Sequence, residues 1–89
     1  MVPTVLGNLT QLVLLNLSYN SFKGQLPSSL ANLIHLNFLD ISRNDFSVGT
    51  SSWIGKLTKL TVLDLDKINL NGEILPFLSN LTALLHCII

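Results

Sequence analysis

Apolar residues recur along the chain in blocks of 24 positions, and the spacing inside each block is irregular. In the first block, leucines stand at positions 9, 12, 15 and 17, so the intervals are three, three and two. An amphipathic helix repeats at three and four positions and a half-buried strand at two, so neither element alone explains the pattern. The same spacing returns from residue 33, from residue 57 and, in part, from residue 81. Recurrence at a fixed distance indicates a chain built from stacked repeats.

Each block has one place for a short strand and one for a turn. Leu15 and Leu17 are two positions apart, as on the buried face of a strand, and Asn20 follows where the backbone leaves it. An amide both donates and accepts hydrogen bonds, so we expect Asn20 and its equivalent Asn44 to bond to the backbone of adjacent coils. Ile68 takes the third equivalent position and interrupts this ladder of amides.

Three stretches fit the form L-x-x-L-x-L-x-x-N-x-L, which is the leucine-rich repeat: "LVLLNLSYNSF", "LNFLDISRNDF" and "LTVLDLDKINL". In addition, "FKGQLPSSLANL" and "LNGEILPFLSNL" resemble the L-x-G-x-I-P-x-x-L-G-N-L segment of plant-specific leucine-rich repeats, found in receptor-like kinases, receptor-like proteins and polygalacturonase inhibitors. The resemblance implies an α/β solenoid, a right-handed coil of about 3.5 repeats of 24 residues. It further implies a parallel β-sheet on the concave face, with short helical or 3-10 turns on the convex face.

The family also forms a second, smaller sheet beside the main one, and here the sequence departs from the pattern. In "FSVGTSSWIGKL", Val48 stands at the position that Gly24 occupies one block earlier. We therefore expect the second sheet to be irregular. The whole chain, residues 1–89, is expected to be one uncapped domain from a longer ectodomain. Its repeat units are approximately 9–32, 33–56 and 57–80, with partial units 1–8 and 81–89.

Composition narrows the possible functions. A hydrophobic content of 48% with 11% charged residues excludes a disordered tail. The formal net charge of zero offers no electrostatic attraction to nucleic acid or an anionic membrane, so neither is an expected partner. No apolar run is long enough to insert into a bilayer, and the first residues lack the features of a signal peptide. Cys87, the one cysteine, replaces a core leucine, and we expect it to be a small core residue.

The sequence contains no constellation for catalysis. No nucleophile and base pairing, phosphate-binding loop or Cys/His metal spacing is present, so we assign no catalytic, cofactor-binding or metal-binding residue. Asp40, Asp64 and Asp66 share the expected sheet face, but no Gly-rich loop of oxygen ligands accompanies them. We interpret these carboxylates as part of a solvated face with occasional ion pairing.

The side chains that the core does not require are the candidates for recognition. Strand residues that face outward would project onto the concave face, and such a surface suits an extended peptide or a protein. The candidate partner-binding residues are Tyr19, Phe38, Asp40, Arg43, Asp64, Asp66 and Lys67. Three N-x-[ST] sequons make Asn8, Asn16 and Asn80 candidates for N-glycosylation if the parent protein is secreted.

The resemblance implies a non-enzymatic recognition module of a plant receptor-like protein or kinase, acting in signalling or defence at the extracellular face of the plasma membrane. Its partner would be a peptide or protein ligand, with a co-receptor as one alternative, and any kinase activity would lie in a parental domain outside this chain. Two other interpretations are a secreted inhibitor of a cell-wall-degrading enzyme, like the polygalacturonase inhibitors, and a structural spacer.

Overall fold

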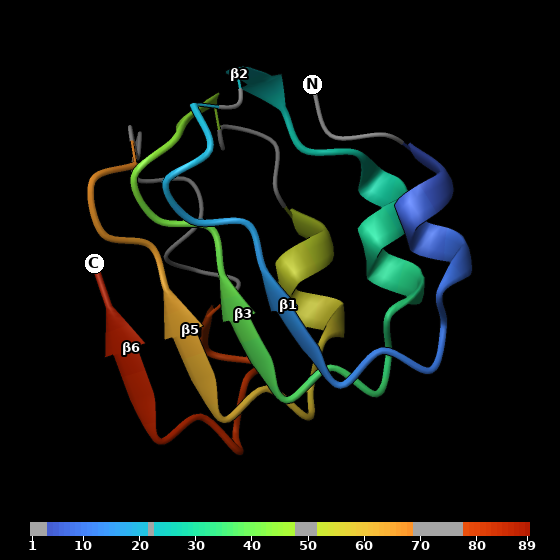
Figure 1. Cartoon of the computed structure of the whole chain (residues 1–89). Coiled ribbons are helices and arrows are strands. Elements are labelled where there is room, and N and C mark those ends of the chain that lie inside the picture. Colours follow the sequence, from blue (N-terminus) through green and yellow to red (C-terminus); the bar gives the residue numbers. More distant parts are fainter. Residues whose placement is uncertain (1–3, 22, 48–51, 69–77) are drawn as a thin grey trace.

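Four parallel strands stack into one sheet, each contributed by one turn of the coil (Figure 1). The computed structural model describes residues 4–21, 23–47, 52–68 and 78–89. The strands of the main sheet are, in spatial order, β1 (Leu14–Asn16), β3 (Phe38–Asp40), β5 (Val62–Asp64) and β6 (His86–Ile88). Paired residues in this sheet are 24 positions apart, so Leu15 lies opposite Leu39 and Leu39 opposite Leu63. The predicted solenoid of parallel strands with a 24-residue repeat is confirmed.

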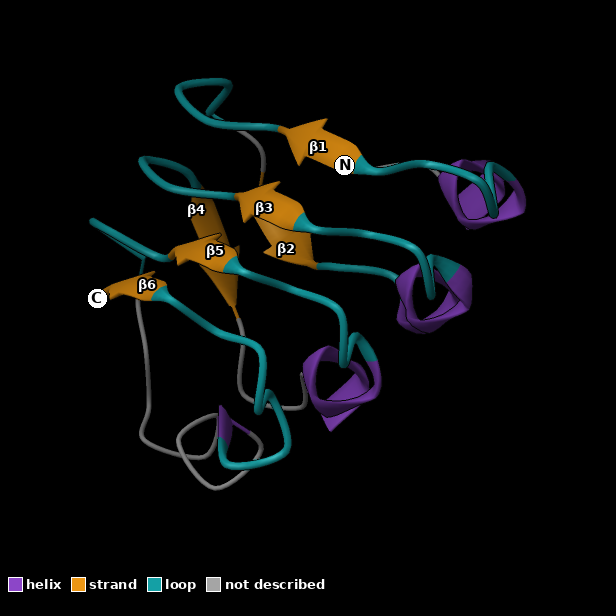
Figure 2. Cartoon of the chain, turned by 90° about the horizontal axis from the view of Figure 1, so that it is seen from below, coloured by secondary structure: helices purple, strands orange, loops and turns teal. Residues whose placement is uncertain are grey.

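Short 3-10 helices cover the other side of the coil (Figure 2). They are η1 (Thr4–Asn8), η2 (Ser28–Asn32) and η3 (Ser52–Lys56), again 24 positions apart. A Cβ atom added to Gly7 would lie 2.4 Å from the carbonyl oxygen of Ser29, so only glycine permits this close approach of η1 to η2. Later coils place Ala31 and Gly55 at the same position. Small residues therefore let the convex helices pack against one another.

The inward leucines of neighbouring coils form one continuous core. Leu33 and Leu57, in the second and third coils, are fully buried, whereas their equivalent Leu9 in the first coil is 53% exposed. Both inner leucines have a coil on either side, whereas Leu9 has a described coil on one side only. A single repeat cannot bury its own apolar face, so burial depends on both neighbours.

Cys87 corrects one expectation. Its place in β6 is opposite the buried Leu63, as the repeat predicts, but the residue is exposed rather than part of the core. β6 is the outermost strand of the main sheet, and no further coil of the described chain covers it. The strand position of Cys87 was predicted correctly, and its burial was not.

The second sheet follows a different register. It consists of β2 (Lys23–Gln25) and β4 (Asp45–Ser47), and Gly24 lies opposite Phe46, only 22 positions later. The alignment of Gly24 with Val48 is therefore wrong, although the expected irregularity is confirmed. Ser21 has a φ of 53°, whereas Asp45, 24 positions later, already lies in the extended strand β4. The third unit's segment, with Gly72, lies outside the described residues.

The side chain of Asn44 joins two coils. Its amide nitrogen donates to the carbonyl oxygen of Leu17 at 2.7 Å and to that of Ser42 at 3.0 Å. Its amide oxygen accepts from the backbone N–H of Asn20 at 3.1 Å. The predicted amide bonding between coils is confirmed for this buried residue. Asn20 is exposed, and its amide donates to Ser18 of its own turn, because no described coil precedes it.

At the third position of this ladder, Ile68 is half-buried and packs against the core. No helix among residues 4–21, 23–47, 52–68 and 78–89 is long and apolar enough to cross a membrane.

Replacing Asn44 by Ala is expected to lower the free energy of unfolding by about 1–3 kcal/mol, because buried backbone groups of two coils would lose their partners. Asn20→Ala is the matched control, since the exposed amide can be replaced by water, and its cost should stay below about 1 kcal/mol. Urea denaturation followed by circular dichroism measures both. Equal costs for the two variants would contradict a bonding role of Asn44 between coils.

Candidate functional site: the outer face of the main sheet

The outward side chains of the main sheet form two columns that run across the strands. The first is apolar and contains Leu14, Phe38 and Val62, which lie opposite one another in register. Leu14 is 58% exposed, and Phe38 and Val62 are half-buried. β6 continues this column with the exposed His86. The sheet thus presents an accessible apolar stripe on its concave side.

The second column begins two residues further along each strand, with Asn16, Asp40 and Asp64. The Oδ1 atom of Asp40 accepts from the backbone N–H of Ser42 at 3.0 Å and from its hydroxyl at 2.6 Å. Asp64 accepts from the backbone N–H of Asp66 at 3.0 Å. In each coil, the outward side chain therefore closes the turn that follows its own strand.

Asn16 accepts the same bonds from Ser18, at 3.0 Å from the backbone and 2.6 Å from the hydroxyl. An amide thus fills this structural role as well as a carboxylate does. The spacing of Asn or Asp two positions before Ser or Asp, repeated in each block, is a sequence signal for these turns. The sequence interpretation of a merely solvated acidic face missed it.

Arg43 connects side chains from three coils. Its guanidinium carbon lies 5.0 Å from the centroid of the Tyr19 ring, and its Nη2 atom lies 3.2 Å from Oδ2 of Asp66. The side chains of Arg43 and Asp66 are 41% and 32% exposed, so solvent screens this ion pair, and it contributes little to stability. Its main effect is to hold the guanidinium beside the exposed ring of Tyr19.

Tyr19, Arg43 and Lys67 form the outer edge of the same face. They share a left-handed backbone, with φ values of 58°, 55° and 59°. The backbone N–H of Tyr19 donates to Ser42 and that of Arg43 to Asp66, so consecutive turns are bonded together. Because the three turns have the same geometry, the structure brings these side chains into one row.

All seven predicted partner-binding residues therefore lie on one side of the molecule, in two structural classes. Phe38, Asp40 and Asp64 are carried by strands, and the other four, Tyr19, Arg43, Asp66 and Lys67, by the turns that follow. The list of candidate binding residues omitted Leu14, an exposed member of the apolar column, although its position one block before Phe38 places it on the same outward face.

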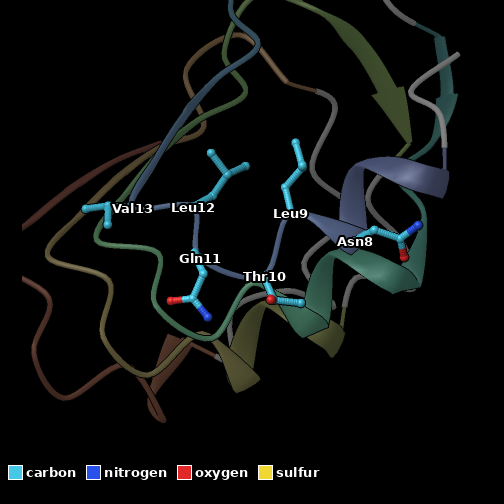
Figure 3. Close-up of a pocket in the computed structure, with 6 residues that line it drawn as sticks. All are labelled: Asn8, Leu9, Thr10, Gln11, Leu12 and Val13. Carbon is cyan, nitrogen blue, oxygen red and sulfur yellow. The ribbon is translucent and has the colours of Figure 1, made fainter.

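Among the described residues, no group of three or more His, Cys, Asp or Glu side chains could hold a metal ion. A hollow of about 510 Å³ lies along residues 8–13 of the first coil (Figure 3). Leu9 and Leu12 point into the same space there, and their equivalents in the next two coils are core residues. This hollow is the open end of the leucine core.

The three sequons occupy two different surfaces. Asn8 ends η1, Asn80 lies at the equivalent position three blocks later, and both are exposed on the convex side. Asn16 is exposed at the end of β1 on the concave side, where its Oδ1 atom is already bonded to Ser18.

Comparison with known proteins gives a consistent result. The family model described as Leucine Rich Repeat matches residues 11–33, 35–57 and 59–81. The crystal structure of PEPR1–AtPEP1 is similar with a TM-score of 0.87 and 34% identity, over 96% of this chain and 12% of that chain. No curated protein is a significant match.

A second solved structure is the leucine-rich repeat ectodomain of the plant membrane receptor kinase GASSHO1/SCHENGEN3 from Arabidopsis thaliana, in complex with CASPARIAN STRIP INTEGRITY FACTOR 2. Its TM-score is 0.83 and its identity 34%, over 96% of this chain and 10% of that chain. The chain therefore spans about a tenth of the solved chains that it matches.

The left-handed turns give a prediction at Lys67, which is exposed and has no described ion pair. Lys67→Val should lower the free energy of unfolding by about 1–2 kcal/mol, because a β-branched residue tolerates a positive φ poorly. Lys67→Gly removes the same side chain and suits this backbone, so it should be neutral or stabilising. Denaturant melts of the two variants make the comparison, and equal destabilisation would contradict the left-handed turn.

A second prediction concerns Cys87. Although Cys87 is an exposed residue, partial desolvation of its thiol by the surrounding atoms, and then the negative charge of Asp64, raise the pKa of the thiol above its ordinary value, which lowers the thiolate fraction at neutral pH. Asp64→Asn removes the second cause, so the pKa should fall and alkylation by iodoacetamide should become faster at a given pH. Asp40→Asn, one strand further away, is the control. A pH series of alkylation rates with no difference between Asp64→Asn and the unaltered chain would disprove this coupling.

Proposed function

The chain belongs to the leucine-rich repeat family, and on that premise we propose that it is a non-enzymatic module that binds a peptide or protein ligand. The observation that carries the proposal is the exposed outer face of the main sheet. Its side chains stand on strands and bonded turns, so they are presented in a fixed arrangement. The core uses other residues, the inward leucines, so the outer face is free for recognition.

The parent protein, in this proposal, is a plant receptor-like protein or kinase that acts in signalling or defence, with this segment at the extracellular face of the plasma membrane. The support is the 34% identity with a plant receptor kinase ectodomain that was solved in complex with another factor. The same likeness makes a secreted enzyme inhibitor the less favoured alternative. A co-receptor is a further partner that such a surface could bind.

The three sequons fall into two groups, according to whether a glycan there would leave the outer sheet face open or cover it. A glycan on Asn8 or Asn80 would project from the convex side and leave the outer sheet face open. A glycan on Asn16 would stand beside Asp40 on the next strand and cover the face. We therefore propose Asn8 and Asn80 as the modified residues in a protein whose outer sheet face binds its ligand.

The test compares single alanine variants of the immobilised chain for capture of ligands from plant extracellular fluid. Loss of an interface anchor costs about 2 kcal/mol or more, or roughly a 30-fold loss of affinity. We expect such losses among the concave residues, namely Tyr19, Phe38, Arg43, Asp64 and Lys67. The matched convex set, which should retain affinity, is His35, Lys56 and Lys59.

Circular dichroism of each variant separates lost binding from lost structure. The convex set is a stringent control, because two of its alanine variants also remove a contact between coils. This contact joins Nζ of Lys59 to Nδ1 of His35 at 3.4 Å. Full binding by every concave variant would favour the spacer interpretation. Losses confined to the convex set would show that the ligand binds the other side.

A further inference from the structure

Two carboxylates of the outer face are both oriented by the protein and available to a ligand. Asp40 and Asp64 lie opposite each other on neighbouring parallel strands, whose backbones are about 4.8 Å apart. Their Oδ1 atoms are held by the turns that follow each strand. Among the described residues, their Oδ2 atoms accept no hydrogen bond and form no ion pair. Each carboxylate thus presents one oxygen outward in a fixed direction.

The cation beside them is already engaged. Arg43 is paired with Asp66 and lies over the Tyr19 ring, and among the described residues it forms no ion pair with Asp40 or Asp64. Lys67 stands in the outer row of turns, without an ion pair to any residue that the structure describes. Arg43 and Asp66 neutralise each other, and the strand-borne charge that remains is negative.

The apolar column lies at a defined distance from this charge. Phe38 precedes Asp40 by two residues on β3, and Val62 precedes Asp64 by two on β5. Side chains two residues apart on an extended strand point to the same face and are separated by about 7 Å. An extended peptide has the same spacing between its own alternate side chains. The face therefore matches a ligand whose apolar and cationic side chains are two positions apart.

We propose that this surface binds an extended peptide segment in which an apolar residue and an Arg or Lys are separated by one residue. The apolar side chain packs on Leu14, Phe38 and Val62, and the cation lies between the outward oxygens of Asp40 and Asp64. This inference rests on the proposed function, because it specifies the ligand class for the same face. Charge complementarity selects this occupant over an acidic or wholly apolar segment.

The test uses three fluorescein-labelled octapeptides. Each has a different central triplet, which is flanked on both sides by Gly and Ser residues. The first carries Phe-Ser-Arg. The second carries Phe-Arg-Ser, which keeps composition and charge but turns the cation to the opposite face. The third carries Phe-Ser-Glu. Binding to the 89-residue chain, immobilised at low density, is measured at pH 7.5. The first peptide should bind about tenfold more tightly than either control.

The first coil shows which substitutions remove the charge without breaking the turn. Asp40→Asn and Asp64→Asn remove the charge but keep the turn acceptor, as Asn16 shows in the first coil. Each should weaken binding of the Phe-Ser-Arg peptide about tenfold, with an unchanged circular dichroism spectrum. Asp45→Asn removes the same charge from β4, in the second sheet, and should leave affinity within about twofold.

The inference is overturned if the three peptides bind equally, if none binds, or if Asp45→Asn weakens binding as much as Asp40→Asn does. These failures are distinguishable from failure of the proposed function. If Phe38→Ala weakens ligand capture from extracellular fluid while both Asn variants retain it, recognition by this face stands and the basic ligand class is wrong. If neither Phe38→Ala nor the Asn variants affect capture, both are wrong.

Discussion

The burial of each coil's leucines by the next coil is the interaction on which the rest of the structure depends. Leu33 and Leu57 are covered on both sides and have no exposed surface, whereas Leu9 remains half exposed at the first coil. Close stacking also fixes the register of the main sheet, since it brings equivalent strand residues opposite one another. Both the columns of the outer face and the amide contacts of Asn44 follow from that register. The candidate binding surface is therefore a by-product of how the core is closed.

The sequence predicted the parts of the molecule that repeat, and it failed where neighbouring coils differ. The main sheet and the convex helices recur at 24 positions because each coil must offer leucines at the same height. No leucine core requires a constant spacing in the second sheet. The first unit bends at Ser21 and Gly24, which both have positive φ values, and the strands of this sheet pair at 22 positions instead of 24. Cys87 lies opposite Leu63 as its position predicts, but burial also requires a further coil, which periodicity alone does not reveal.

The candidate site was predictable as a face but not in its internal bonding. Alternation along each strand identifies Phe38, Asp40 and Asp64 as outward residues, and the structure places them there. What could not be foreseen from alternation is that Asp40 and Asp64 use one oxygen each to hold a turn. In the proposed mode of binding, folding and recognition share the same carboxylates. A protein can exchange Asp for Asn at these positions, as Asn16 shows, and change the charge of the face without changing its shape.

The glycine at position 7 bears on how strongly the solenoid bends. Hydrogen bonding holds the strand side at about 4.8 Å per coil, whereas the spacing on the helix side depends on the side chains that stand between the helices. Gly7 lets η1 lie against the backbone of Ser29, and Gly55 keeps a small residue at the same level two coils later. Close helices keep the radius of curvature large and the arc shallow. Bulkier residues would spread the helices and narrow the arc, so the length of ligand that can reach the strands at once is set on the opposite side of the molecule.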